Sequence, residues 1–321
     1  MKNYLPEGCL INTAENIRLT GSIAGLHEAM TSGKILEGRA ALCDSEHNII
    51  VDLPCIKGII PRIEGAIGIE SGKTRDIALI SKVNKPVCFK VISINTDSNG
   101  NETAILSRRI VQEECRKQYI ENLSPGDIVP AKVTHLEQFG CFVDIGCGIP
   151  SLIPIDAVSV SRISHPSDRF YPGQDIKVII KGIDSDRIWL SHKELLGTWQ
   201  ENADMFTAGE TVSGIVRSIE DYGIFIELSP NLAGLAEPRE NAQIGQYASV
   251  YIKAVIPEKM KVKLIIVDIF NAEYKPSPLK YFVNDSHISQ WRYPPDSSDK
   301  IIESVFELSL IHISEPTRLQ L

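Results

Sequence analysis

The chain alternates between short runs of apolar and polar residues and turns marked by glycine or proline. Five such runs follow residue 124: PGDIVPAKVTHL, QFGCFVDIG, GIPSLIPIDAV, YPGQDIKVIIKGID and RIWLSHK. A comparable series follows residue 207, and an outline of the same series follows residue 33. Short alternating runs bounded by turn residues are typical of β-strands, and about five strands per repeat indicate a small barrel. The chain is therefore expected to be all-β, with barrels at 34–110, 124–192 and 207–270.

Helical spacing marks the segments between these barrels. Residues 111–123 and 193–206 are both expected to be helical connectors. At the second connector, Ser191 and Glu194 have the spacing of a capping box, and apolar residues then recur at helical intervals. Residues 1–33 are expected to form an N-terminal extension with one short helix that ends at Gly33.

Two different segments follow the third barrel. Residues 271–307 are rich in proline and aromatic residues, which predicts an irregular strap with a last helical turn near its end. The stretch LSLIHISEPTR, which begins at residue 308, matches the translation of an adapter used to build sequencing libraries. Residues 308–321 are therefore expected to be foreign to the native protein, whose own C-terminus would then be missing.

Composition narrows the class of protein. The 321 residues are 43% hydrophobic and 23% charged, a balance typical of a globular chain of two or three domains. The start of the chain has no apolar core of signal-peptide length, and no apolar run reaches membrane-spanning length. The seven cysteines are odd in number and form no CxxC pair, which indicates neither a disulfide framework nor a zinc site. The expected location is a reducing cytoplasm.

One phrase occurs twice, at matching places in the second and third barrels. HLEQFGCFVDIG carries Phe139 and Phe142 around a glycine, and SIEDYGIFIELS carries Tyr222 and Phe225 in the same way. Residues three apart in a regular strand point to opposite faces, so the glycine is expected to bend the strand and return both rings to one face. Two neighbouring rings form a platform on which bases can stack. The alternative is that one ring fills the core, but the repetition favours a platform.

The overall charge is negative, so nucleic-acid binding would depend on the local charges at the binding site. Net charge is −8, whereas a basic stripe is the usual footprint of a nucleic-acid-binding surface. The acidic total argues against bulk electrostatic capture of nucleic acid. It leaves room for a small positive groove, so the decision depends on the site itself.

No catalytic site is expected. GIESGKT, residues 68–74, resembles a phosphate-binding loop, but three residues instead of four separate its glycines. Cys141 and Cys147 with nearby His135 do not have the spacing of metal ligands. The sequence therefore predicts a protein that is not an enzyme, with no metal and no cofactor.

The repeats resemble the RNA-binding barrel of ribosomal protein S1, a variant of the OB-fold. The chain as far as Phe306 is similar to short bacterial homologues of this small-subunit protein, which have three such barrels. The resemblance implies tandem OB-fold barrels of Greek-key topology joined by short helices. It also implies RNA-binding residues in the second and third barrels: Phe139, Phe142, Asp184, Arg187, Tyr222, Phe225 and Lys261.

The chain departs from the family pattern at several positions. Pro154 stands where the second barrel of the family pattern has a histidine. In the third barrel, Glu237 and Pro257 stand where the pattern has a histidine and an aspartate. The first barrel is expected to have lost its platform, because the region of the rings holds Glu46, His47 and Ile50.

The resemblance implies a protein that binds single-stranded RNA or mRNA and acts in translation. It is expected to be a cytoplasmic monomer without a membrane anchor, with its first barrel docked on the small ribosomal subunit. Two other hypotheses stay open: an adaptor whose barrels hold a protein partner, and an accessory subunit of an RNA-decay complex. The acidic balance and the missing histidines favour the adaptor, whereas the doubled ring pair favours RNA binding.

Overall fold

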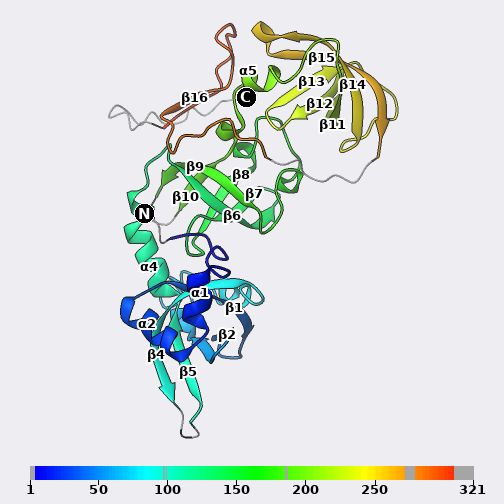
Figure 1. The fold of residues 1–321 in the computed structure, drawn as a ribbon. Coiled ribbons are helices and arrows are strands. Elements are labelled where there is room, and N and C mark those ends of the chain that lie inside the picture. The colour runs from blue at the N-terminus through cyan, green and yellow to red at the C-terminus, as the bar shows by residue number, and fades with distance from the viewer. Residues whose placement is uncertain (1–3, 97, 99, 185–186, 272–278, 307–321) are drawn as a thin grey trace. The chain divides into compact units, whose positions relative to one another are not determined.

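The structure of the chain is a computed structural model that describes residues 4–96, 98, 100–184, 187–271 and 279–306 (Figure 1). Its main feature is three closed five-stranded barrels that follow one another along the chain. Short helices lie before and between them. The prediction of an all-β chain of tandem OB-fold barrels is confirmed.

The first barrel has the strand order β1-β2-β3-β5-β4 and closes through antiparallel pairing of β1 with β4. All its neighbours are antiparallel except β3 and β5, which are parallel. Alternate residues of these strands fill one core, which includes Leu36, Val51, Phe89 and Leu106. Its strands are β1 (Leu36–Cys43), β2 (Ile49–Asp52), β3 (Lys57–Ile60), β4 (Pro86–Thr96) and β5 (Glu102–Ser107).

The second and third barrels have five strands each in the corresponding orders, β10-β8-β7-β6-β9 and β11-β12-β13-β15-β14. The second consists of β6 (Ile128–Glu137), β7 (Gly140–Asp144), β8 (Pro150–Pro154), β9 (Asp175–Ile183) and β10 (Ile188–Ser191). The third consists of β11 (Thr211–Glu220), β12 (Gly223–Ser229), β13 (Leu232–Ala236), β14 (Tyr247–Ile256) and β15 (Lys261–Phe270).

The backbone contacts divide the chain into two compact units, and the division passes through the second barrel. The first unit comprises residues 1–123, 129–153 and 170–177, and the second comprises 124–128, 154–169 and 178–321. The first unit therefore contains the first barrel together with β7 and most of β6 and β8. The second contains β10 and the third barrel.

The N-terminal extension contains two helices instead of the one expected. Helix α1 (Ala14–Thr20) precedes α2 (Ile23–Ser32), which ends at Gly33 with a left-handed φ of 63°. Thr13 and Ser22 cap the two helices, because each side chain accepts a hydrogen bond from a backbone N–H of the first turn. The segment from 109 to 122 forms α4 (Arg109–Gln118) and a 3-10 turn, η2 (Ile120–Asn122).

The connector after the second barrel is not the single helix expected over 193–206. A 3-10 helix, η5 (Lys193–Leu196), and a short helix, α5 (Trp199–Ala203), are separated by Gly197. Gly197 has a φ of 83°, and a Cβ there would lie 2.8 Å from the ring of Phe282, so the backbone cannot continue as a helix. The capping box is formed by Thr198 and Glu201, not by Ser191 and Glu194.

The segment after the third barrel is partly regular. Strands β16 (Gln290–Arg292) and β17 (Glu303–Val305) pair antiparallel, so the expected last helical turn is a strand instead. Trp291 and Tyr293 pack against the core of the third barrel, which holds this segment in place. Residues 307–321, which include the expected adapter stretch, lie outside the described residues. No helix in the described part of the chain is long and apolar enough to span a membrane.

Candidate nucleic-acid interface

The first predicted ring pair lies at the closed end of the β6–β7 hairpin. Glu137 pairs with Gly140, so Phe139 occupies the tight turn between the strands while Phe142 lies on β7. The two ring centroids are 5.9 Å apart, with the ring planes at 90°. Phe139 is 57% exposed, and Phe142 is half-buried beneath it. The edge-to-face geometry is a favourable one for two aromatic rings.

The second predicted ring pair repeats this arrangement in the third barrel. Glu220 pairs with Gly223, which leaves Tyr222 in the turn and Phe225 on β12. Their ring centroids are 6.2 Å apart at 89°, and Tyr222 is 67% exposed. The structure thus brings both rings of each pair together on one surface.

The rings meet for a different reason from the one the sequence suggested. The expected bend at the glycine is absent from β7 and β12. The register shift instead lies on the partner strand, between Val133 and His135 and between Val216 and Ser218. The first ring of each pair is a turn residue and so does not follow strand alternation. Gly223 is needed for close packing, because a Cβ there would lie 2.5 Å from the carbonyl oxygen of Ala236.

The third barrel adds two lysines to the face that carries its rings. Phe225 pairs with Leu235 on β13, and Leu235 pairs in turn with Lys263 on β15. Residues directly opposite in neighbouring strands point to the same face, so Lys263 shares the face of Phe225. Lys261, two residues earlier, shares it too, and both lysines are exposed. Sequence reasoning had selected Lys261 and missed Lys263, although the alternation in KVKL indicates both.

Two positions of the third barrel depart from the family pattern, one at an exposed residue and the other in a turn. Glu237 directly follows β13 and is exposed. Pro257 begins the 3-10 turn η6 (Pro257–Lys259), which joins β14 to β15. Neither residue supplies a cation or a histidine to this face, whereas Lys261 and Lys263 each contribute a positive charge to it.

Asp184 and Arg187 lie together in the hairpin between β9 and β10. The Asp184 N–H donates to the Arg187 carbonyl oxygen at 2.8 Å, and both side chains are exposed. The tip of this hairpin, residues 185 and 186, lies outside the described residues. Contact of these two side chains with the same RNA as Phe139 and Phe142 stays a prediction.

His135 is a residue of this surface that sequence reasoning considered only as a metal ligand. It pairs with Phe142 across the hairpin, and its ring stacks on that of Phe142 with centroids 6.4 Å apart and planes at 25°. The Nε2 atom of His135 lies 2.7 Å from a carboxylate oxygen of Glu137. The third barrel has Ser218 at the corresponding position opposite Phe225. The place of His135 beside Phe142 depends on the register of the hairpin. The bulge on β6 sets this register, and the sequence pattern does not reveal it.

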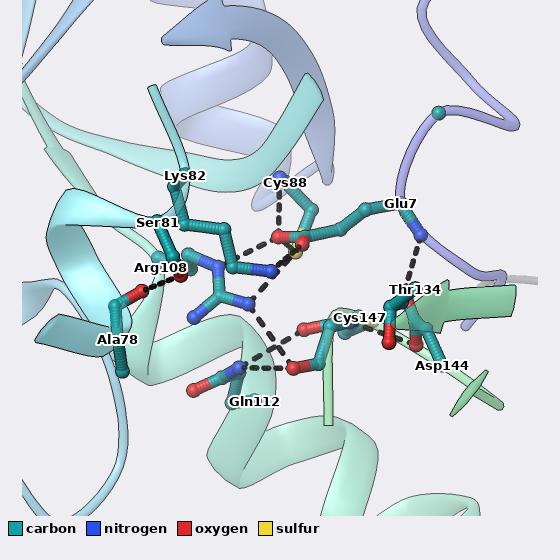
Figure 2. Close-up of polar contacts among 12 residues, drawn as sticks. Glu7, Ala78, Ser81, Lys82, Cys88, Arg108, Gln112, Thr134, Asp144 and Cys147 are labelled. Atoms are coloured by element: carbon teal, nitrogen blue, oxygen red, sulfur yellow. Dashed lines mark hydrogen bonds and ion pairs between the residues drawn. The ribbon is translucent and has the colours of Figure 1, made fainter. Parts of the chain in front are cut away.

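The far end of β7 is held by a buried ion cluster (Figure 2). The carboxylate of Glu7 accepts hydrogen bonds from Arg108 Nε at 2.6 Å and from Lys82 Nζ at 2.7 Å. The backbone N–H of Glu7 donates to Asp144, the last residue of β7, at 2.7 Å. Asp144 also accepts from the N–H groups of Gly146 and Gly148, which follow β7. The N-terminal segment thereby fixes the loop that leaves β7.

The charges of this cluster are balanced inside the protein. Burial by itself would raise the pKa of Glu7, but the guanidinium of Arg108 and the ammonium of Lys82 outweigh it and hold that pKa well below its usual range. Burial raises the pKa of Asp144 to about 6, with the nearby charge of Glu7 adding to the effect. A structural role accounts for these groups, because they are largely buried and bond to one another at the end of β7 that lies away from the ring hairpin.

The first barrel has no ring pair at the corresponding hairpin. Leu42 pairs with Ile50, which takes the place of Phe142 and is only 6% exposed. His47 lies in the turn with a left-handed φ of 65°. Five residues, 44–48, separate the paired Cys43 and Ile49, whereas four, 137–140, separate the paired Leu136 and Cys141 of the second barrel. The longer turn and the buried isoleucine leave this hairpin without a stacking platform.

Comparison with known proteins identifies relatives of the chain and a family that one barrel matches. The S1 RNA binding domain family matches residues 123–193. The small ribosomal subunit protein bS1 of Staphylococcus aureus strain COL is 28% identical over 277 residues, which cover 81% of this chain and 68% of that protein. The chain is a homologue of bacterial ribosomal protein bS1. The bS1 of Leuconostoc lactis is 31% identical over 236 residues, which cover 71% of this chain and 52% of that protein.

The homology to bS1 applies most directly to the second barrel. The matched S1 domain contains all of β6 to β10, and with them the first ring pair and the hairpin of Asp184 and Arg187. A multidomain protein with nucleic acid binding domains from Streptococcus pneumoniae is 14% identical and covers 73% of each chain, with a TM-score of 0.25. That score is too low for a structural conclusion.

Proposed function

We propose that this bS1 homologue binds single-stranded RNA, including mRNA, on the outer faces of its second and third barrels and acts in translation. The observation that carries the proposal is the repeated ring pair, with centroids 5.9 and 6.2 Å apart at the same hairpin position of two barrels. Every base has a π-face, so exposed ring pairs bind single strands with little sequence preference, at about 1–3 kcal/mol per stacked base.

Basic residues complete the proposed site. Arg187 in the second barrel and Lys261 in the third are exposed and are proposed to hold phosphates, as is Lys263 beside Lys261. Asp184 is proposed to contact the ribose or base beside Arg187. No cofactor and no catalytic group are part of this function. Binding to two barrels of one chain raises the apparent affinity above that of either barrel.

The partners follow from the homologues. Because those proteins are named as components of the small ribosomal subunit, we propose that this chain associates with that subunit. The first barrel, whose hairpin has no ring pair, is proposed as the docking part. The protein is proposed to act as a monomer in the cytoplasm.

The test removes the most exposed ring of each pair from the full chain. Phe139→Ala combined with Tyr222→Ala is expected to leave the unfolding temperature unchanged, because both rings are turn residues on the surface. Affinity for a single-stranded oligoribonucleotide is expected to fall at least about tenfold, since each lost stack costs about 1–3 kcal/mol. The salt dependence of binding should not change, because stacking releases no counterions.

Two control variants make the result specific. Tyr171→Ala removes a 56% exposed ring that belongs to neither pair, and it should leave RNA affinity unchanged. Arg187→Ala should reduce the slope of log affinity against log salt concentration by about one, as expected for one lost phosphate contact. A folded double-ring variant with unchanged RNA affinity would contradict the proposal and favour the protein-interaction adaptor.

A further inference from the structure

The second and third barrels differ at one position of their ring surfaces. His135 stacks on Phe142 in the second barrel, whereas the third barrel has Ser218 at the equivalent place opposite Phe225. The third barrel instead has Lys261 and Lys263 on the face of its ring pair. The hairpin thus carries three neighbouring rings in the second barrel and two in the third, where β15 adds the two lysines to the same face.

The imidazole of His135 has a polar edge that the phenylalanines lack. Its side chain is 64% exposed, and Glu137, which it contacts, is 46% exposed. A carboxylate only accepts hydrogen bonds, so the 2.7 Å contact with Glu137 places a proton on Nε2. The other ring nitrogen, Nδ1, is then the acceptor of the neutral imidazole.

The charge beside His135 decides which part of RNA it can contact. His135 contacts the carboxylate of Glu137, so the pair offers no net positive charge to an anion. Such a pair is a poor partner for a phosphate, which needs a net positive site. A base is neutral, and its amino or imino hydrogen can donate to the imidazole while its ring extends the stack over Phe142.

We propose that His135 is a base-contacting residue of the second barrel, which adds a third ring to the stack and accepts a hydrogen bond from a base edge. The assignment rests on the proposed RNA-binding function. It gives the second barrel a base contact beside Phe139 and Phe142 that the third barrel, with Ser218 at the equivalent place, lacks.

The experiment uses the full chain with Tyr222→Ala, which weakens the third barrel so that the second dominates. The probe is an unstructured oligoribonucleotide of about 12 nucleotides, within the site sizes of OB-folds. In this background, His135→Ala is expected to reduce affinity at least about fivefold, with no change in the salt slope. His135→Phe keeps the ring but lacks the acceptor, and it should recover only part of the loss. Ser218→Ala is the matched control and should have no effect.

Each of the other outcomes excludes one part of the proposal. Unchanged affinity in His135→Ala, together with a loss in Phe139→Ala, would exclude the role of His135 and leave the proposed function standing. A salt slope reduced by about one would mean a phosphate contact instead of a base contact. Full recovery in His135→Phe would exclude the hydrogen bond. Loss in neither His135→Ala nor Phe139→Ala would exclude the stacking function itself.

Discussion

At the scale of single residues, the second barrel depends on a histidine that must stay neutral. His192 follows β10 and is fully buried, with Nδ1 2.9 Å from the carbonyl oxygen of Val158 and its ring edge-on to Tyr281 at 5.7 Å. Burial lowers its pKa to about 4, because the charged imidazolium loses its water. His192 is thus a buried neutral residue of the second barrel, whereas the side chain of His135 is exposed on its surface.

The lowered pKa of His192 predicts a defined loss of stability in acid. The unfolded chain takes up the proton near pH 6.5 and the folded chain only near pH 4, so the stabilisation is complete above 6.5 and is lost as the pH falls towards 4. The loss attributable to this residue at about pH 5 is about 2 kcal/mol. Urea unfolding near pH 7 and near pH 5 measures it. His192→Gln should show a smaller difference between the two pH values than the unchanged protein, whereas His27→Gln, at an exposed histidine on α2, should show the same difference.

At the scale of elements, the β7 strand is positioned from both ends. Its first residues form the hairpin that carries Phe139 and Phe142, and its last residue, Asp144, is held by the backbone of Glu7. The loop after it passes beside the buried pair of Glu7 and Arg108. Gly148 in this loop has a φ of 71°, and a Cβ there would collide with Arg108 Nη2 and Glu7 Oε2.

A methyl group at Gly148 should therefore disturb the ion pair of Glu7 and Arg108 as well as the local backbone. Gly148→Ala is expected to lower the free energy of unfolding by at least about 3 kcal/mol, because it disturbs a buried ion pair in addition to straining the backbone. Gly173→Ala is the matched control: its φ is 89°, but no atom lies within 4 Å of the added Cβ. That variant should cost only about 1 kcal/mol of backbone strain. Equal costs in urea unfolding would show that the ion pair tolerates the intrusion.

At the scale of the whole molecule, three barrels of one topology carry different surfaces. The second and third have ring pairs, whereas the first has a buried isoleucine at the same place. The cations of the first barrel are largely engaged within the protein: Arg62 with Asp76, Arg108 with Glu7, and Arg109 with Glu64. The missing ring pair is the observation behind the proposal that the first barrel is the docking part.

This division predicts that RNA binding and subunit association separate. The variant with Phe139→Ala and Tyr222→Ala should still co-sediment with the small ribosomal subunit, because its first barrel is unchanged, while it loses most binding to a free oligoribonucleotide. Quantitative co-sedimentation of the variant and the unchanged protein, in parallel with oligonucleotide titration, measures both. An equal loss in the two assays would show that association depends on the rings and not on the first barrel.

The fold could be predicted from the sequence more completely than the candidate site. Strand alternation and turn residues act between neighbours in the chain, so the three barrels and the two ring hairpins could be predicted from them. The single helix expected over 193–206 was wrong, because helical spacing of the apolar residues does not reveal the φ of 83° at Gly197 that separates η5 from α5. The contact of Asp184, Arg187 and Lys261 with RNA stays a prediction, since their positions in the family pattern are the evidence for it.

The sequence by itself determined that this protein is a series of small β-barrels with a repeated aromatic phrase, because periodicity and turn chemistry are local properties. Tertiary structure alone decided which residues surround those aromatics. A bulge on β6 places His135 opposite Phe142, parallel pairing of β13 with β15 brings Lys263 to the face of Phe225, and burial joins Glu7 to Arg108. Strand register and burial depend on residues far apart in the chain, and no local pattern specifies them.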